Sequence, residues 1–220
     1  MAATPSAPPH LLEPVWSAQP NLWDFTAASH LLRRAGFGGS TAETRQLVDL
    51  GPEKAVASLV NYAGIQDDFH PIEFGELTAN GYGPGNKGGA MQGMAPAAVR
   101  SMTPEQRKAL FQLNQGANAE KLQEMKMWWL DRMVRTPRPL EEKMTLFWHG
   151  LFVSNLMSVR STILLYNQNE LFRKFATGNY KDLTLEVSKN PAMLIFLNNN
   201  DNKKEHPNDC LLYTSDAADE

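Results

Sequence analysis

The sequence predicts an all-α fold, an irregular multi-helix domain of about eight helices. Apolar residues recur every three or four positions through most of the chain, and residues typical of helix starts and ends flank these stretches. No run alternates apolar and polar residues between hairpin-type turns, so no strand is predicted. With 42% hydrophobic and 20% charged residues in 220 positions, the composition is that of a globular protein.

Three helices are predicted in the N-terminal part of the chain. The first covers residues 24–36, with Asp24 as its cap. The second begins at Ser40, which can form a capping box with Glu43 three positions later, each side chain satisfying the other's free backbone N–H. The third begins at Pro52, a residue suited to the first turn because it lacks the N–H that would have no partner there.

Further helices are predicted after a glycine-rich insertion at about 64–100, which we interpret as a long mobile segment. Gly116 is a point at which the first of these helices could divide in two, and Gly178 is the predicted end of the third. The helical patterns lie at residues 103–136, 138–153, 161–178, 179–190 and 192–199.

Residues 1–22 are predicted to form a disordered leader, because five prolines remove backbone donors and favour extended conformations. They are Pro5, Pro8, Pro9, Pro14 and Pro20.

The formal net charge of −3 does not indicate a nucleic acid or a membrane surface as a partner, and the partners stay unknown.

The single cysteine, Cys210, excludes an intrachain disulfide and a multi-cysteine zinc site.

The N-terminus has no basic start followed by an apolar run, and no stretch reaches the roughly 20 apolar residues of a membrane span. We therefore expect a cytoplasmic protein without a membrane span. No cofactor is indicated by the sequence, so any cofactor stays unknown.

One histidine, His149, lies among large apolar residues in the stretch EEKMTLFWHGLFVSN. On a helix it shares a face with Glu142 and Thr145. The carboxylate is two turns away, so any coupling to the histidine needs a group between them. The pair could be a general base with an acid partner, or two ligands of a metal. The interpretation we favour is a histidine packed in the core. The spacing is not H-E-x-x-H, so no metal site is predicted.

A second candidate site is the stretch HLLRRAGFGGS. His30, Arg33 and Arg34 can gather positive charge next to the free N–H groups of the helix that starts at Ser40. Such an arrangement can hold a phosphate or a carboxylate. The glycine pattern matches neither a P-loop nor a dinucleotide fingerprint. A tight turn between helices with solvated arginines is the interpretation we favour.

Three ordered motifs resemble a bacterial family known as domain of unknown function 1800 (DUF1800). They are HLLRRAGFGGS, PLEEKMTLFWHGLFVSN and the region from Tyr166 to Asn208. The resemblance covers Trp23 to about Asn208 apart from the glycine-rich insertion. It implies a mostly helical protein and brings no established activity, substrate or cofactor. Many members have a second histidine two residues after the first, where this chain has Leu151, which weakens a two-histidine metal site.

The resemblance also implies that the domain is incomplete at its C-terminal end. The family continues after Pro207 and Asn208 with a further helical half, whereas residues 209–220 resemble translated sequencing-adapter read-through. We therefore expect a partial helical domain at 23–208 and an artefactual tail at 209–220. Helices without their partners would expose apolar faces and make the product poorly soluble or molten.

The biochemical function expected from these observations is unknown. The interpretation we favour is a helical binding or scaffold module, with the turn at Arg33 and Arg34 contacting an anionic group or a partner protein. The alternative is a hydrolase-like enzyme that uses His149 and Glu142 together with residues from the missing C-terminal half.

Overall fold

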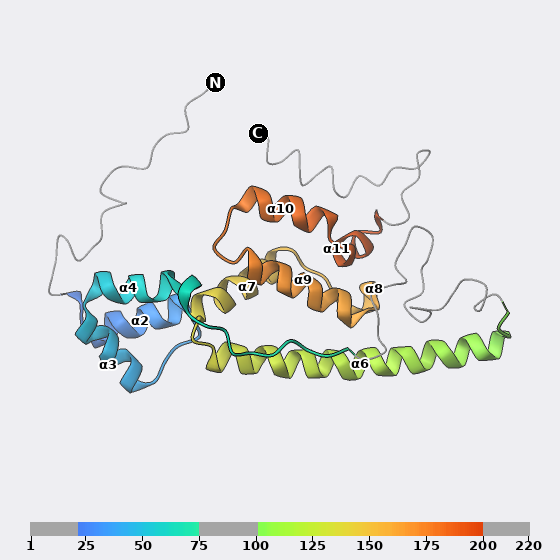
Figure 1. The fold of residues 1–220 in the computed structure, drawn as a ribbon, viewed down its shortest axis with the longest axis horizontal. Helices are drawn as coiled ribbons and strands as arrows, with labels where there is room; N and C mark the ends of the chain where they lie inside the picture. The colour runs from blue at the N-terminus through green and yellow to red at the C-terminus, as the bar shows by residue number, and fades with distance from the viewer. Residues whose placement is uncertain (1–21, 75–100, 200–220) are drawn as a thin grey trace, which may run out of the picture. The chain divides into compact units, whose positions relative to one another are not determined.

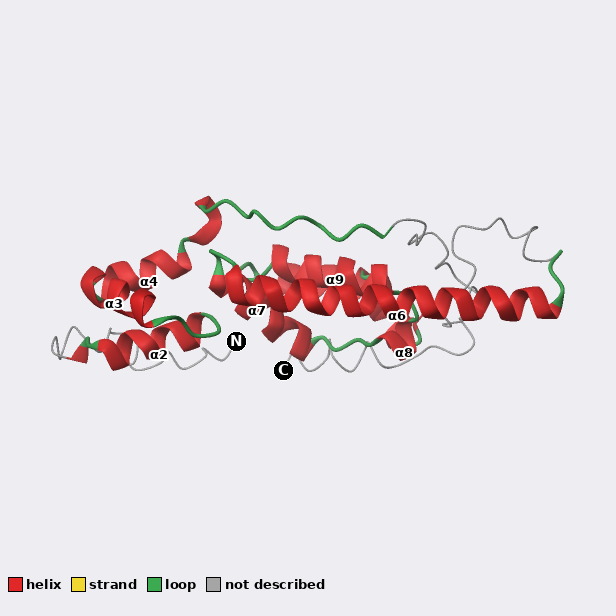
Figure 2. Cartoon of the chain, turned by 90° about the horizontal axis from the view of Figure 1, so that it is seen from below, coloured by secondary structure: helices red, strands yellow, loops and turns green. Residues whose placement is uncertain are grey.

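The computed structural model describes residues 22–74 and 101–199 (Figures 1 and 2). Within these ranges every regular element is a helix, nine of them α-helices and one a 3-10 helix. The all-α prediction is therefore confirmed. Residues 1–21 of the predicted leader, most of the glycine-rich insertion and the predicted tail lie outside the described residues. The chain divides into two compact units.

The first unit ends at Asp67 and also includes Pro137–Lys143. Its helices are α2 (Phe25–Ala35), α3 (Thr41–Leu50), α4 (Pro52–Val60) and the 3-10 helix η3 (Tyr62–Gly64). Its core is a cluster of small and branched apolar side chains, namely Ala28, Leu32, Leu47, Ala55 and Leu59. The small residues allow α2, α3 and α4 to approach closely, so three short helices share one core.

The helix starts predicted for the first unit are confirmed. The side chain of Asp24 accepts a hydrogen bond from the Ala27 N–H at 2.8 Å. Ser40 and Glu43 form the capping box, and Pro52 occupies the first turn of α4. These caps satisfy backbone donors that have no partner within the helix, which fixes where each helix begins.

The second unit comprises Asp68–Thr136 and the residues from Met144 onward. Its helices are α6 (Pro104–Arg135), α8 (Leu156–Val159), α9 (Thr162–Lys174), α10 (Tyr180–Lys189) and α11 (Pro191–Phe196). Helix α7 (Pro139–Leu151) begins in the first unit and ends in the second. In Figure 1, α9 lies between the long helix α6 and the pair formed by α10 and α11, and it packs against all three and against α8.

Helix α9 is the most deeply buried element of the second unit. Its Phe172 has an exposed fraction of 0% and packs with Leu183 and Val187 of α10 and Met193 of α11. A separate cluster joins α8, α9 and α11; its buried members are Val159, Leu164, Leu165 and Ala192. Because α9 contributes to both clusters, it holds the short helix α8 in place on one side and α10 with α11 on the other.

The structure differs from the predicted helices by a few residues at several helix ends and most clearly at three places. Helix α6 is not divided at Gly116, because the cost of one glycine, about 1 kcal/mol, is small beside the hydrogen bonds of a 32-residue helix. Helix α9 ends at Lys174 rather than at Gly178, and a turn follows in which the Gly178 N–H donates to the Phe175 carbonyl. Helix α8 was not predicted at all.

No helix in the described ranges combines the length and the apolar character that a membrane crossing requires.

Candidate functional site

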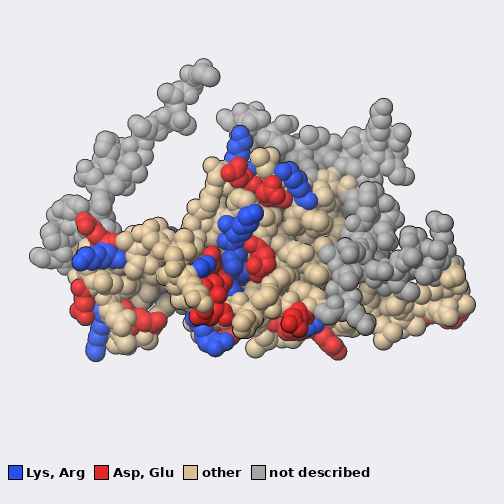
Figure 3. Space-filling view, in the orientation of Figure 1, with Lys and Arg blue, Asp and Glu red and all other residues tan. Residues whose placement is uncertain are grey.

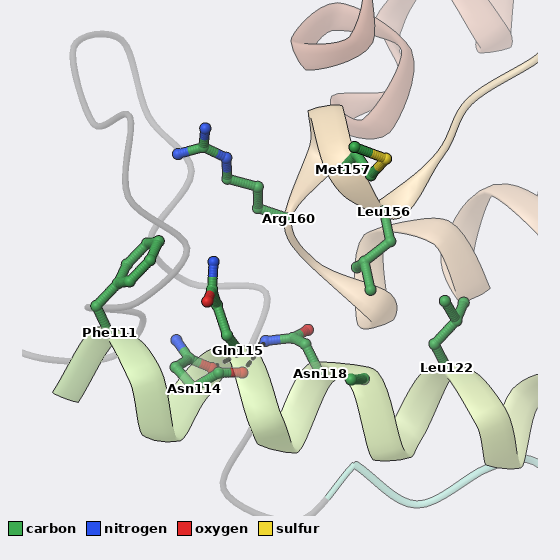
Figure 4. Close-up of a pocket in the computed structure, with 9 residues that line it drawn as sticks. Phe111, Asn114, Gln115, Asn118, Leu122, Leu156, Met157 and Arg160 are labelled. Atoms are coloured by element: carbon green, nitrogen blue, oxygen red, sulfur yellow. Dashed lines mark hydrogen bonds between the residues drawn. The ribbon is translucent and has the colours of Figure 1, made fainter. Parts of the chain in front are cut away.

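A groove of about 560 Å³ lies between α6 and α8 in the second unit (Figure 4). Apolar side chains and side-chain amides form most of its lining. The lining residues are Phe111, Asn114, Gln115, Asn118, Ala119, Leu122, Leu156, Met157 and Arg160. The α6 residues recur at three- and four-residue spacing, so they occupy one face of that helix.

Asn118 fixes the floor of the groove. Its side-chain Nδ2 donates to the carbonyl oxygen of Asn114 at 2.9 Å, and its Oδ1 accepts from the backbone N–H of Thr162 at 2.8 Å. The Thr162 hydroxyl in turn donates to the Asn118 carbonyl at 2.7 Å. These bonds are buried and join α6 to the first residue of α9. The groove therefore has a hydrogen-bonded frame without any ligand.

Helix α8 supplies the opposite wall of the groove. Its cap is Asn155, whose side chain accepts from the Ser158 N–H at 2.9 Å. It ends at Arg160, which adopts a left-handed conformation with φ 57° and donates its backbone N–H to the Leu156 carbonyl at 2.8 Å. For a residue with a side chain this conformation costs on the order of 1 kcal/mol.

Arg160 is the charged residue of the groove. Figure 4 shows its side chain extending over the groove on the same side as Phe111 and Gln115. None of the described lining residues carries a carboxylate, and the Arg160 guanidinium has no ion pair with the residues that the structure describes. The groove thus combines apolar walls with one positive charge at its rim.

The predicted catalytic residue His149 lies half-buried near two aromatic rings. The His149 ring meets Trp129 of α6 edge-on at 5.3 Å and Phe172 of α9 at 6.4 Å, measured between ring centroids. Burial lowers the pKa of His149 below its ordinary value, because a charged imidazolium is poorly solvated among these rings. Within the described ranges neither ring nitrogen has a hydrogen-bond partner. This environment favours the neutral imidazole.

The face of α7 that carries Glu142 and Thr145 is turned inward. Both residues have an exposed fraction of 0%, whereas Phe147 and Leu151 on the other face are 56% and 52% exposed. The predicted common face is confirmed, and it is the buried one. Glu142 is about 10 Å from His149 along the helix axis and belongs to the other unit. Their joint catalytic role stays a prediction.

Helix α9 carries two neighbouring side-chain amides that are buried, those of Gln168 and Asn169. Gln168 accepts a hydrogen bond from the Ser154 hydroxyl, and Asn169 accepts one from Arg173 Nη2 at 2.8 Å. Neither amide nitrogen has an acceptor among the described residues. Each buried donor without an acceptor lowers the free energy of unfolding by about 1–3 kcal/mol.

The four predicted anion-binding residues are all exposed, in or beside α2 and at the start of α3. Arg33 donates to the Ser29 hydroxyl at 2.6 Å. The backbone N–H and the hydroxyl of Ser40 both donate to Oε2 of Glu43, at 2.6 and 2.8 Å. These bonds lower the pKa of Glu43. A carboxylate of the chain itself therefore occupies the helix start, and anion binding by His30, Arg33, Arg34 and Ser40 stays a prediction.

A second hollow of about 700 Å³ lies beside α6 and carries carboxylates. Glu124 pairs with Lys121 at 2.6 Å, and Asp131 pairs with Arg135, which lowers the pKa of Asp131. On the face drawn in Figure 3, acidic and basic side chains likewise lie side by side. Because Glu124 and Asp131, two of the three carboxylates that line it, already have cationic partners, this hollow offers less to a ligand than the groove between α6 and α8.

A comparison with known protein families relates the chain to one of them. A family model described as "Protein of unknown function (DUF1800)" matches residues 30–211, which is most of the chain. The chain belongs to the DUF1800 family. The resemblance noted from the three motifs is therefore confirmed. The region that matches contains the whole groove and every predicted site residue of this DUF1800 protein. No curated protein and no solved structure matches the chain.

Sequence reasoning missed the groove of this DUF1800 protein because it missed α8. A helix of four residues gives no periodic signal. The available signal was Asn155, since asparagine is a favoured N-cap, followed by the apolar pair Leu156 and Met157. Even with that helix predicted, its position against α6 depends on tertiary contacts through Asn118 and Thr162.

Proposed function

We propose that this chain is a binding module whose ligand occupies the groove between α6 and α8. The observation that supports the proposal is the groove itself, about 560 Å³ with mainly apolar walls and a few polar groups. Ligand sites commonly have this size and composition, because apolar walls supply affinity and a few polar groups fix orientation. A binding module is also the function we favoured from the sequence, although there we expected the contact at Arg33 and Arg34.

The apolar wall of the groove is exposed to water, which favours binding of a ligand that covers it. Met157 has an exposed fraction of 89%, although it stands next to the half-buried Leu156. Removing a side chain such as Met or Leu from water contributes about 1.5–3 kcal/mol to the free energy of binding. Asn118 already holds α6 against the start of α9, so a ligand would not have to order the backbone of the floor.

Titration with Nile red, an uncharged dye that fluoresces in apolar surroundings, tests the proposal. Ala119 is an exposed residue of the lining, so Ala119→Trp fills the groove without altering the core. We expect the parent protein to bind the dye with saturation and Ala119→Trp to weaken binding at least about tenfold.

The matched control is Gln123→Trp, which adds the same ring at an exposed position of α6 outside the lining. This variant should bind the dye within about twofold of the parent. Circular dichroism checks that both variants keep the parent's helix content. Equal loss in both variants, or equal binding by all three proteins, would reject the groove as the binding site.

The hydrolase alternative rests on His149 and Glu142 and stays a prediction from the sequence. No observation on the described residues favours it over binding. The cytoplasmic location also stays a prediction from the sequence.

A further inference from the structure

We infer that the ligand of the groove is a small amphiphile, an acyl chain that ends in a carboxylate, with the carboxylate held at Arg160. This inference rests on the proposed binding function and names its ligand class. It joins two properties of the described lining: an apolar wall along α6 and α8, and at the rim the Arg160 guanidinium, which has no ion pair with a described residue.

The apolar part of the groove fits a chain rather than a compact ring system. Phe111 and Leu122 are eleven residues apart on α6, so the lined face is about 16 Å long. That length is comparable with an extended chain of about twelve carbons, and the volume lies in the range typical of small-molecule sites. Each methylene group that leaves water strengthens binding about fourfold. The ligand's affinity would therefore come mainly from its chain.

The rim selects the charge of the head group. The planar guanidinium of Arg160 can donate two parallel hydrogen bonds to a carboxylate. Gln115 lies on the same side of the groove in Figure 4 and offers a further donor. None of the described lining residues is acidic, so they do not repel an anion, whereas a cationic head group would be repelled by Arg160.

The backbone at Arg160 supports a positioning role for this residue. Its φ of 57° is rare for residues other than glycine, asparagine and aspartate. A glycine or asparagine would end α8 with less strain, so arginine is present at a local conformational cost. A side chain that contacts a ligand explains why arginine stands at this turn.

Calorimetric titration with three twelve-carbon probes, each below its micellar concentration or solubility limit, tests the inference. The probes are dodecanoate, dodecanol and dodecyltrimethylammonium, which share a chain and differ in head-group charge. We expect one dodecanoate per chain, bound at least about tenfold more tightly than either other probe. Arg160→Asn tolerates the left-handed backbone and removes the charge, so it should weaken dodecanoate about tenfold and leave dodecanol unchanged.

Two further variants separate charge from structure. Arg160→Lys keeps the positive charge and should recover part of the affinity for dodecanoate. Lys126→Gln removes an exposed cation of α6 outside the lining and should leave all three affinities unchanged.

The outcomes separate this inference from the binding function on which it rests. If dodecanoate and dodecanol bind equally, Arg160→Asn changes neither, and Ala119→Trp removes both, the carboxylate inference is overturned while the groove remains a binding site. If an apolar helical peptide displaces Nile red and dodecanoate does not, the groove binds a protein partner, and the inference is again overturned. If Ala119→Trp alters no binding at all, both proposals fail.

Discussion

At the scale of single residues, burial decides how the polar side chains of α7 behave. Glu142 and Thr145 are fully buried, and His149 is packed against Trp129 and Phe172. Helical spacing could predict that these polar residues share a face. It could not predict that this face is the inner one, because that depends on which helices cover it. The apolar side chains of Leu146, Phe147 and Leu151 on the same helix are exposed.

The environment of His149 predicts a loss of stability in mild acid. Burial lowers its pKa in the folded chain below the unfolded value of about 6.5, so the unfolded chain binds a proton more readily. The contribution of the neutral ring is fully present above pH 6.5 and is lost as the pH falls from there towards the folded pKa. Urea denaturation at pH 7.5 and pH 5.5 should show a smaller decrease in unfolding free energy for His149→Gln than for the parent.

His30→Gln is the control for this measurement, because it removes an exposed histidine of α2. It should retain the decrease seen in the parent. A decrease of the same size in His149→Gln would show that other groups cause the acid sensitivity. The pH titration of the His149 ring, followed by NMR, reports the direction of the pKa change independently.

At the scale of elements, capping residues allowed most helix starts to be predicted. Asp24, Ser40 and Pro52 act as the sequence indicated, and Thr103 forms a capping box with Gln106 at the start of α6. A cap can be predicted from sequence because it depends on side chains within three or four positions. Helix α8 could not be predicted, because its four residues owe their position to α9 and α11 rather than to their own pattern.

Continuity of α6 through Gly116 leads to a second prediction. Nothing lies within 4 Å of a Cβ added at this glycine, so alanine fits without a clash. Gly116→Ala should raise the free energy of unfolding by about 0.5–1 kcal/mol, because alanine loses less backbone entropy in a helix. Urea denaturation measures the change.

Gly51→Ala is the contrasting variant. Gly51 also has open space, but its φ of 78° strains any residue with a Cβ. This substitution should lower the free energy of unfolding by about 1–2 kcal/mol. A destabilising effect of Gly116→Ala would mean that α6 is broken or bent at this glycine in solution.

At the scale of the whole molecule, burial is distributed unevenly among the helices. Eight of the thirteen residues of α9 are buried: Thr162, Leu164, Leu165, Tyr166, Gln168, Asn169, Phe172 and Arg173. The first half of α6 is mostly exposed, and its Leu113 has an exposed fraction of 72%. Helices with few buried contacts open locally at low free energy, so the two elements should differ in stability.

Hydrogen exchange followed by mass spectrometry checks this difference. Peptides from the first half of α6, residues 107–116, should exchange at least about tenfold faster than peptides from residues 165–173 of α9. Uniform and rapid exchange of both segments would indicate a molten state, which the exposed apolar residues led us to expect from the sequence. Equal slow exchange would contradict the exposure of the first half of α6.

Periodicity and motifs allowed the fold class and the family to be predicted, because both are properties of local sequence. The groove between α6 and α8 could not be predicted. Its residues lie in two segments, 111–122 and 156–160, that meet through the Asn118–Thr162 hydrogen bonds and through the apolar cluster against which Leu122 and Leu156 pack. Such a contact between distant residues leaves no periodic signal in the sequence.

A dodecanoate titration followed by methyl NMR tests the central claim, that the groove binds a ligand, most directly. The account predicts saturable shifts for the methyl groups of Leu122, Leu156 and Met157, which line the groove. The exposed methyl groups of Leu130 and Val134, elsewhere on α6, should not move. Shifts largest at Leu130 and Val134, or spread over all exposed apolar residues, would contradict the claim.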